Sequence, residues 1–206
     1  LPSQSAYENA MRQFFALFPT VKVISPWNEA NHFTQPTSRS PSSAAKFTNT
    51  VAKLCTDCKI VVADILDQAD NVRAKRPTFR STTRYIKAFR KAYKGPRSIC
   101  GIHNYSDTNR FRSTGTKAII KALGCKQIWL TEAGGLYKFV GYKANQKRQL
   151  KATKYMFKVA KANKKIKRAY VYSWFGAPRS ARFDSGIVGT DGKPRKAFAE
   201  VRKHLK

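Results

Sequence analysis

Hydrophobic and polar positions follow two alternating patterns along the chain. Stretches with apolar residues every three or four positions predict helices, and short β-branched or aromatic runs between them predict strands. The expected helices cover residues 7–18, 42–55, 85–93, 116–123, 147–162 and 197–204, and the expected strands cover residues 21–25, 60–65, 99–105, 127–131 and 169–174. Strict alternation of strand and helix indicates an α/β fold with parallel strands and crossover helices.

Two architectures accept this alternation, an open doubly wound sheet and a closed barrel. Each strand-helix unit takes roughly 30 to 40 residues, which suits one right-handed crossover. The pair Gly134-Gly135 lacks the spacing of a dinucleotide-binding loop, so the nucleotide-binding sheet loses support. Polar and aromatic residues instead gather after several strands, on the face where barrels build active sites. We therefore favour a single barrel-type domain over residues 1–206.

The composition limits the partners. The 206 residues are 42% hydrophobic, enough for one buried core, and 41 Lys and Arg against 11 Asp and Glu give a net charge of +30. This charge attracts polyanions, but the basic residues are spread over nearly every helix, which is equally typical of a solvated outer face. No finger, basic-zipper or RNA-binding sheet motif is present, so no specific nucleic-acid partner is expected.

The chain carries no run of apolar residues long enough to span a membrane. It does not begin with Met or with a basic and apolar leader, so we expect a processed or excised chain.

The four cysteines lie at positions 55, 58, 100 and 125. The pair Cys55 and Cys58 fits a redox dithiol, half of a zinc site or a small disulfide. Redox motifs of this spacing usually open a helix after a strand, whereas this pair closes a helix before a strand. Cys100 and Cys125 lie in strand-like segments whose orientation the sequence leaves open, so a zinc site is the weakest choice. We predict a structural disulfide between Cys55 and Cys58, and with it an exported protein.

Two of the four glutamates stand where strands end. Glu29 follows the strand in "VISPWNEANH", and Glu132 ends the strand in "IWLTEAGG", three strand-helix units further on. In a barrel both carboxylates converge on one face. Glycosidic cleavage requires two carboxyl groups, one that donates a proton and one that attacks or stabilises the sugar centre. The alternative is that each glutamate only binds a neighbouring Lys or Arg.

At these residues the sequence resembles clan A of the (β/α)8-barrel retaining glycoside hydrolases. The resemblance implies that Asn28-Glu29 ends the fourth barrel strand, with Glu29 as acid/base, and that Glu132 ends the seventh strand as nucleophile. By the same resemblance Asn28 binds the sugar 2-hydroxyl, and "GIHNYSD" supplies His103 and Tyr105 beside the nucleophile.

The resemblance also assigns Trp174, in "YVYSWFGAP", to the floor of the sugar subsite at the end of the eighth strand. His32 is expected to line the cleft, although it could instead cap the following loop. Asp64 and Asp67 flank the end of a strand, where a sugar subsite and a salt bridge to a nearby Arg are equally open. The visible strands are then four to eight of a TIM barrel, and the first three are lacking.

The sequence therefore predicts a secreted or cell-surface retaining glycosidase that acts on a poly- or oligosaccharide. This mechanism needs no metal or organic cofactor, so none is expected. An anionic cell-surface polymer is a further expected partner, and a missing N-terminal segment could complete the barrel. The alternative is a catalytically inactive, barrel-derived protein that binds carbohydrate or an anionic polymer through its basic surface.

Overall fold

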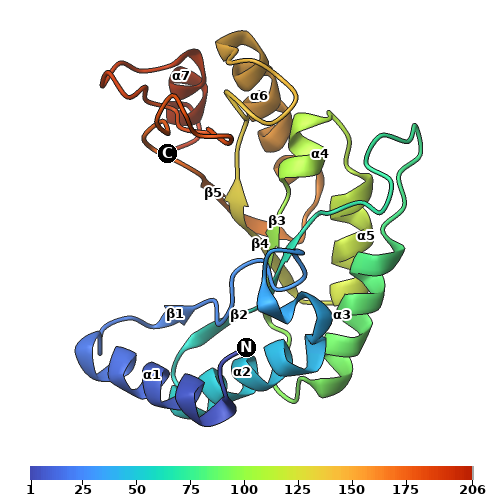
Figure 1. Ribbon diagram of the computed structural model, residues 1–206, viewed down its shortest axis with the longest axis vertical. Helices are drawn as coiled ribbons and strands as arrows, with labels where there is room; N and C mark the ends of the chain where they lie inside the picture. The colour runs from blue at the N-terminus through green and yellow to red at the C-terminus, as the bar shows by residue number, and fades with distance from the viewer. Residues whose placement is uncertain (206) are drawn as a thin grey trace.

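The computed structural model describes residues 1–205 and contains one sheet of five parallel strands (Figure 1). The strands lie in chain order and are β1 (Val23–Ile24), β2 (Lys59–Leu66), β3 (Ile99–His103), β4 (Gln127–Ala133) and β5 (Ile166–Val171). The helices are α1 (Gln4–Leu17), α2 (Pro41–Leu54), α3 (Arg80–Ala92), α4 (Tyr105–Asn109), α5 (Thr114–Leu123), α6 (Gln146–Ala162) and α7 (Lys196–Arg202), with a 3-10 turn, η1, at Pro36–Arg39.

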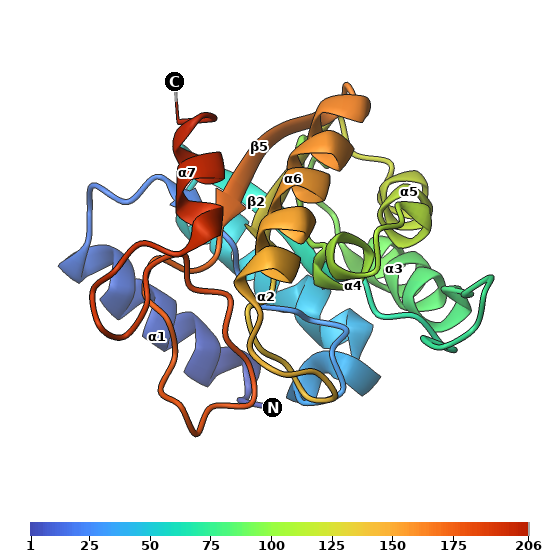
Figure 2. The same ribbon diagram turned by 90° about the horizontal axis from the view of Figure 1, so that it is seen from above.

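The sheet curls into part of a barrel, and β1 and β5 form its two open edges. Figures 1 and 2 show α2, α3, α5 and α6 along the outer side of the curled sheet. Barrels of this type close with eight strands, and five are present among residues 1–205. The predicted fold, a (β/α)8-type barrel that lacks three strands, is confirmed.

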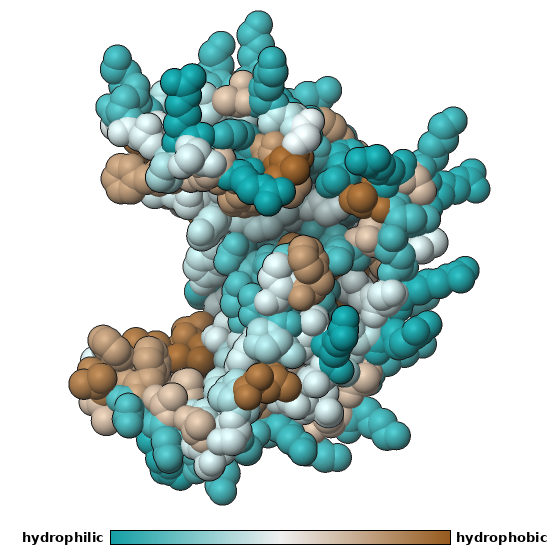
Figure 3. All heavy atoms as spheres, in the orientation of Figure 1, coloured by the Kyte–Doolittle hydropathy of each residue, from teal (hydrophilic) through white to brown (hydrophobic). Residues whose placement is uncertain are grey.

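The core lies between the sheet and the outer helices. It is formed by large aliphatic and aromatic side chains that are almost fully buried: Ile65, Ile86, Phe89, Ile102, Ile119, Leu123, Ile128, Leu130 and Met156. The edge elements contribute far less, because β5 has no fully buried residue and α1 has none either. Figure 3 shows apolar side chains gathered at the end of the molecule where α1 lies. Leu17, the last residue of α1, and Phe18 after it are exposed.

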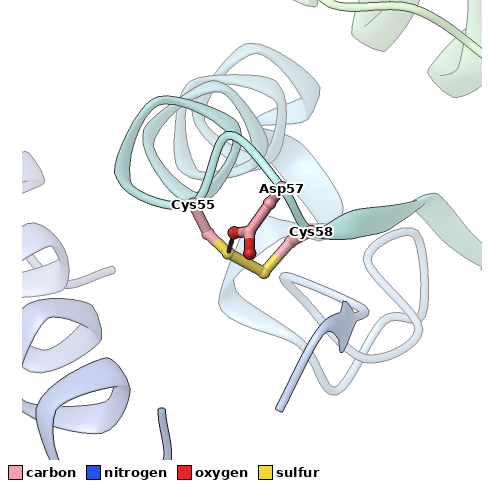
Figure 4. Close-up of side chains that lie close together, drawn as sticks. All are labelled: Cys55, Asp57 and Cys58. Atoms are coloured by element: carbon pink, nitrogen blue, oxygen red, sulfur yellow. Dashed lines mark hydrogen bonds between the residues drawn. A yellow bond between two sulfur atoms is a disulfide. The ribbon is translucent and has the colours of Figure 1, made fainter. Parts of the chain in front are cut away.

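Residues 1–205 contain two disulfides. Cys55 and Cys58 are bonded across the turn between α2 and β2, as predicted, and an oxygen of Asp57 lies 3.1 Å from the Cys55 sulfur (Figure 4). Cys100 in β3 is bonded to Cys125, which lies just before β4. The sequence did not predict this second bond. None of the helices in the described residues has the length and apolar character needed to cross a bilayer.

The predicted elements are all present, but several of their boundaries were wrong by two residues or more, three of them in α3, β3 and β5. Helix α3 begins at Arg80, five residues earlier than predicted, because the Asp70 carboxylate accepts hydrogen bonds from the amides of Arg80 and Ser81. The strand predicted to run to Tyr105 ends at His103, and α4 begins at Tyr105 instead.

The third error concerns the last strand. Strand β5 covers Ile166–Val171 rather than residues 169–174. Lys167 and Arg168 are both exposed and interrupt the apolar pattern, while Ile166 pairs with Ile128 of β4. As a result, Trp174 lies three residues beyond the end of the strand.

Candidate active site

A cleft of about 610 Å³ opens at the carboxyl ends of the strands. Its walls combine polar and ionisable groups with aromatic rings, which is typical of small-molecule sites in barrels. It is lined among others by Asn28, Glu29, His32, Phe33, Asp67, Gln68, Tyr105, Ser106, Arg110, Glu132, Phe139, Tyr142, Tyr172 and Phe183.

The two predicted glutamates both face this cleft. Glu132 lies in β4, and Glu29 lies in the loop after β1, five residues beyond the end of that short strand. A carboxylate oxygen of Glu29, one of Glu132 and a ring nitrogen of His103 all lie within 4.8 Å of one another. Glu29 adopts a left-handed backbone conformation with φ 44°, so a tight turn directs its side chain. Asn31 fixes the loop by exchanging two 2.9 Å hydrogen bonds with the backbone of Leu66.

The buried His103 ring lies between the two glutamates and a third carboxylate, that of Asp64. Its Nδ1 is 3.0 Å from Glu29 Oε1 and 3.7 Å from Glu132 Oε2, and its Nε2 is 3.3 Å from Asp64 Oδ1. Burial lowers the pKa of His103, but hydrogen bonds to Asp64 and Glu29 and the charges of Asp64 and Glu132 raise it to about 10. An imidazolium donates from both nitrogens at once, so this state matches the two carboxylates that flank the ring.

A bulge in β2 brings Asp64 to this histidine. Ala63 and Asp64 have φ values of 75° and 36°, and the pairing of β2 with β3 shifts register between Val62 and Ile65. The Asp64 carboxylate also accepts hydrogen bonds from the hydroxyls of Ser25, at 2.7 Å, and Thr131. Between them stands Gly101 of β3, where a Cβ would collide with the Asp64 carboxylate. Asp64 is therefore a buried partner of His103 rather than a partner of an arginine.

Helix α4 positions Tyr105 against Glu132. The Tyr105 hydroxyl donates a 3.1 Å hydrogen bond to Glu132 Oε2. The helix can begin immediately after β3 because Asp67 accepts hydrogen bonds from the amides of Ser106 and Asp107, at 2.8 and 2.6 Å. At its other end, the Asn109 side chain donates to the Gly134 carbonyl at 2.9 Å, which ties the helix to the segment after Glu132.

The environment of Glu132 raises the pKa of its carboxyl group. Burial is the largest cause, and the charges of Glu29 and Asp64 act in the same direction. The positive His103 and the hydroxyl of Tyr105 oppose the rise by stabilising the ionised form. Burial and the adjacent Glu132 charge raise the pKa of Tyr105, so its hydroxyl remains a proton donor in this pair.

The remaining predicted residues divide into two groups. Asn28 and His32 line the cleft, and His32 Nδ1 lies 3.8 Å from Glu29 Oε2 and 2.6 Å from the Thr34 hydroxyl. Trp174 is not among the cleft-lining residues of the described chain. Its ring is half exposed and packs edge-on against Phe198 of α7. The shift in the bounds of β5 accounts for this position.

Several cleft residues were missed in the sequence. Tyr172 and Phe183 form the wall on the β5 side, and their rings lie 6.4 Å apart. Arg110 and Tyr142 line another part of the cleft. The position of Tyr172, next to the end of β5, was a usable signal, whereas Phe183 comes from an irregular loop whose course the sequence pattern does not indicate.

Among residues 1–205, two groups of side chains have the donor atoms of a small metal site. The first is Glu29, His103 and Glu132. A protonated His103, as its raised pKa implies, has no free nitrogen lone pair for a metal. The second group is Cys55, Asp57 and Cys58, whose sulfurs are bonded to each other and are not thiolates.

Residues 3–198 match the family model of the glycosyl hydrolase catalytic core. The chain belongs to this glycosyl hydrolase family. The match covers every element that builds the cleft, so the glycoside hydrolase type predicted from the two glutamate motifs is confirmed at the level of the family. Among curated proteins the sequence has no match.

Solved glycoside hydrolase structures share the fold of this glycosyl hydrolase core. A beta-glucuronidase from an uncultured Clostridium species has a TM-score of 0.65 at 14% identity, over 98% of this chain and 35% of its own. The beta-D-glucuronidase of Dictyoglomus thermophilum gives 0.66 at 11% identity, over 98% and 35%. Xylanase 10B of Thermotoga maritima gives 0.63 at 14% identity, over 97% and 64%. The chain thus spans about a third of the glucuronidases and less than two thirds of the xylanase.

Proposed function

We propose that the chain is the catalytic portion of a retaining glycosidase, with Glu132 as the nucleophile and Glu29 as the general acid/base. The observation that carries this proposal is the approach of the two carboxylates to within 4.8 Å in one cleft. Retaining enzymes hold their carboxyl groups about 5 to 5.5 Å apart, whereas inverting enzymes leave about 6.5 to 9.5 Å for a water molecule.

The reaction proceeds in two displacements. Glu132 attacks the anomeric carbon and forms an ester bond, while Glu29 transfers its proton to the glycosidic oxygen and the leaving sugar departs. Water then attacks the same carbon, gives a proton back to Glu29 and breaks the ester. Each step breaks one bond at the anomeric carbon and forms another from the opposite face, which inverts the configuration. Two such steps return the sugar to the configuration it had.

The neighbours of Glu132 support its role as the nucleophile. Tyr105 and His103 hold Glu132 from two sides, and both favour its ionised, nucleophilic form. Asn28 and His32 line the cleft beside Glu29 and are suited to bind sugar hydroxyls. Trp174 lies outside the cleft lining, so its predicted role as a sugar platform requires a different position of its loop.

The raised pKa of Glu132 has a consequence for activity. Because the nucleophile must be ionised, activity falls as the pH drops through the pKa of Glu132. That acid limb lies at a higher pH than an unshifted glutamate would give, since burial raises the pKa of Glu132.

Covalent trapping tests the mechanism. A panel of activated 2-deoxy-2-fluoro glycosides should label the protein with one sugar, and digestion and mass spectrometry should locate the ester at Glu132. The variant Glu132→Gln should remain unlabelled, and Glu8→Gln, at a partly exposed position of α1 outside the cleft, serves as the matched control. A second test uses azide, which should rescue Glu29→Ala and give a glycosyl azide of retained configuration.

Failure of labelling across all sugars, with a folded chain, would favour the inactive binding protein instead. A label on a residue other than Glu132 would refute the assignment of the nucleophile. The two disulfides support an exported protein, because such bonds persist in oxidising compartments.

A further inference from the structure

One positive side chain in the cleft lacks a negative partner. Arg110 lines the cleft together with Glu29 and Glu132 and immediately follows α4. Its backbone amide donates a 3.1 Å hydrogen bond to the Ser106 carbonyl, which fixes the start of the side chain. Within residues 1–205 the Arg110 guanidinium forms no ion pair. Its one hydrogen bond there is a 3.5 Å contact with the Ser106 hydroxyl.

Two other arginines, Arg112 and Arg148, lie near Arg110, and both already have partners within the chain. Arg112 pairs with Asp107 at 3.2 Å and donates to the Ser106 hydroxyl at 2.9 Å. The guanidinium of Arg148 stacks over the Tyr142 ring at 4.3 Å and donates to the Asn109 carbonyl at 2.7 Å. Both therefore have fixed positions, and Arg110 is the one guanidinium of the three that faces the cleft.

The charge balance around Arg110 is positive. Of the nearby carboxylates, Asp107 is paired with Arg112, and Asp67 accepts two backbone hydrogen bonds without forming an ion pair with Arg110. Burial lowers the pKa of Arg110 from its usual value, the charges of Arg112 and Arg148 act in the same direction, and the charge of Asp67 opposes them in part. Arg110 is exposed at the open side of the cleft, and a bound anion relieves this repulsion because it adds a counter-charge to the guanidinium.

The surface of the chain adds a field of the same sign. Between Asp70 and Asp184 the only acidic residues are Asp107 and Glu132, and neither is on the exposed outer face. Most of the 41 Lys and Arg residues fall in this same stretch. Figure 3 shows hydrophilic side chains projecting along the side of the molecule where α3 and α5 lie. Such a surface raises the local concentration of anionic substrates and accelerates their encounter with the cleft.

We propose that Arg110 binds an anionic group, a carboxylate or a sulfate, carried by a sugar unit of the substrate, so that the cleft selects acidic over neutral glycans. The planar guanidinium matches the paired oxygens of either group in a two-bond contact. Arg110 is then a specificity residue and takes no part in proton transfer. This inference rests on the proposed glycosidase function for its kinetic readout, and on binding alone for an independent one.

The test compares an acidic oligosaccharide with its carboxyl-reduced, neutral form, using the full chain. Wild type should favour the acidic form, and Arg110→Gln should lose about 10-fold or more in kcat/KM on that form, mainly through KM. Arg110→Gln should leave kcat/KM on the neutral form unchanged. Arg84→Gln, which removes the same charge from the exposed face of α3, is the matched control and should change neither value by more than about 2-fold at 150 mM salt.

Calorimetric binding of the same two oligosaccharides provides the arm that does not depend on turnover. Weaker binding of only the acidic form by Arg110→Gln supports the inference, even if no sugar is cleaved and the proposed function fails. An equal loss on both forms, or an equal loss in Arg84→Gln, overturns it. A sulfated oligosaccharide without carboxylates distinguishes the two anions, because retention of the Arg110 effect identifies sulfate as a sufficient group.

Discussion

Replacement of His103 by Gln should remove a pH-dependent contribution to stability. His103 is 1% exposed and carries a pKa of about 10, against about 6.5 for the unfolded chain. Because the folded pKa is the higher one, the stabilisation is fully present below about pH 6.5 and is lost as the pH rises through about 10. The shift from 6.5 to about 10 corresponds to a contribution on the order of 5 kcal/mol.

The size of this effect follows from the three carboxylates around the ring. Without the imidazolium, Glu29, Asp64 and Glu132 face one another with no positive charge between them, and removal of one partner of a buried ion pair typically costs about 3–5 kcal/mol. In strong acid these carboxylates become protonated, so the cost of the substitution falls again. The difference in stability between wild type and His103→Gln should therefore be largest just below about pH 6.5 and smaller both in strong acid and at high pH.

Urea unfolding followed by tryptophan fluorescence measures this difference. Both proteins are unfolded at intervals from pH 5 to pH 11, and the wild-type value minus the variant value is plotted, which cancels the titration of the many lysines. His204→Gln is the control, since His204 lies 3.5 Å from Glu200 in a partly exposed pair, and its loss should cost less than about 1 kcal/mol throughout. A difference that stays constant between pH 7 and pH 11 would refute the assignment of a buried imidazolium.

Three further substitutions test an ion pair, a disulfide and a hydrogen bond. Asp184→Asn should lower the free energy of unfolding by about 3–5 kcal/mol, because it leaves the buried Arg195 unpaired, and a loss below 1 kcal/mol in urea unfolding would contradict this. Replacement of both Cys100 and Cys125 by Ala should cost about 3.5 kcal/mol, since this disulfide closes a loop of 25 residues, and an unchanged Tm would argue against that account. Tyr105→Phe should reduce kcat/KM about 10-fold or more and move its acid limb to higher pH, because the lost hydroxyl favours the ionised nucleophile; an unchanged pH profile would show that the bond does not form.

The sequence pattern was sufficient for the elements and for the two glutamates. Helical and strand periodicities reflect which side chains face the core, so they identified every strand and all the long helices. Glu29 and Glu132 could be paired because parallel strands bring their carboxyl ends together, whatever the details of the loops.

Long-range contacts explain what the pattern did not predict. The start of α3 depends on Asp70, ten residues before Arg80, and the start of α4 depends on Asp67, which comes from the preceding unit. Neither capping carboxylate belongs to the local periodicity of its helix. The disulfide of Cys100 and Cys125 had a usable signal, since each cysteine lies near the start of a neighbouring parallel strand, but its formation requires the two strands to be in register.

The partner of His103 illustrates a different limit. Asp64 reaches the ring because β2 contains a bulge, and a one-residue change of register reverses the side to which a side chain points. Gly101 also had to lack a side chain for this approach. From the sequence, a sugar subsite and an arginine pair were equally open for Asp64. The structure shows a third possibility, a buried contact between Asp64 and His103, which depends on how β2, β3 and β4 are arranged in space.

The open edges of the sheet bear on the burial of the site more than on its direct contacts. The groups that control Glu132 are Tyr105, His103, Asp64 and Glu29, and all of them come from β1 to β4 and their loops. Three further barrel strands would pair with the edges at β1 and β5 and would add walls to the cleft. The direct contacts of the candidate nucleophile therefore all lie within residues 1–205, whereas the extent of its burial and the number of sugar units that the cleft holds depend on what covers its open side.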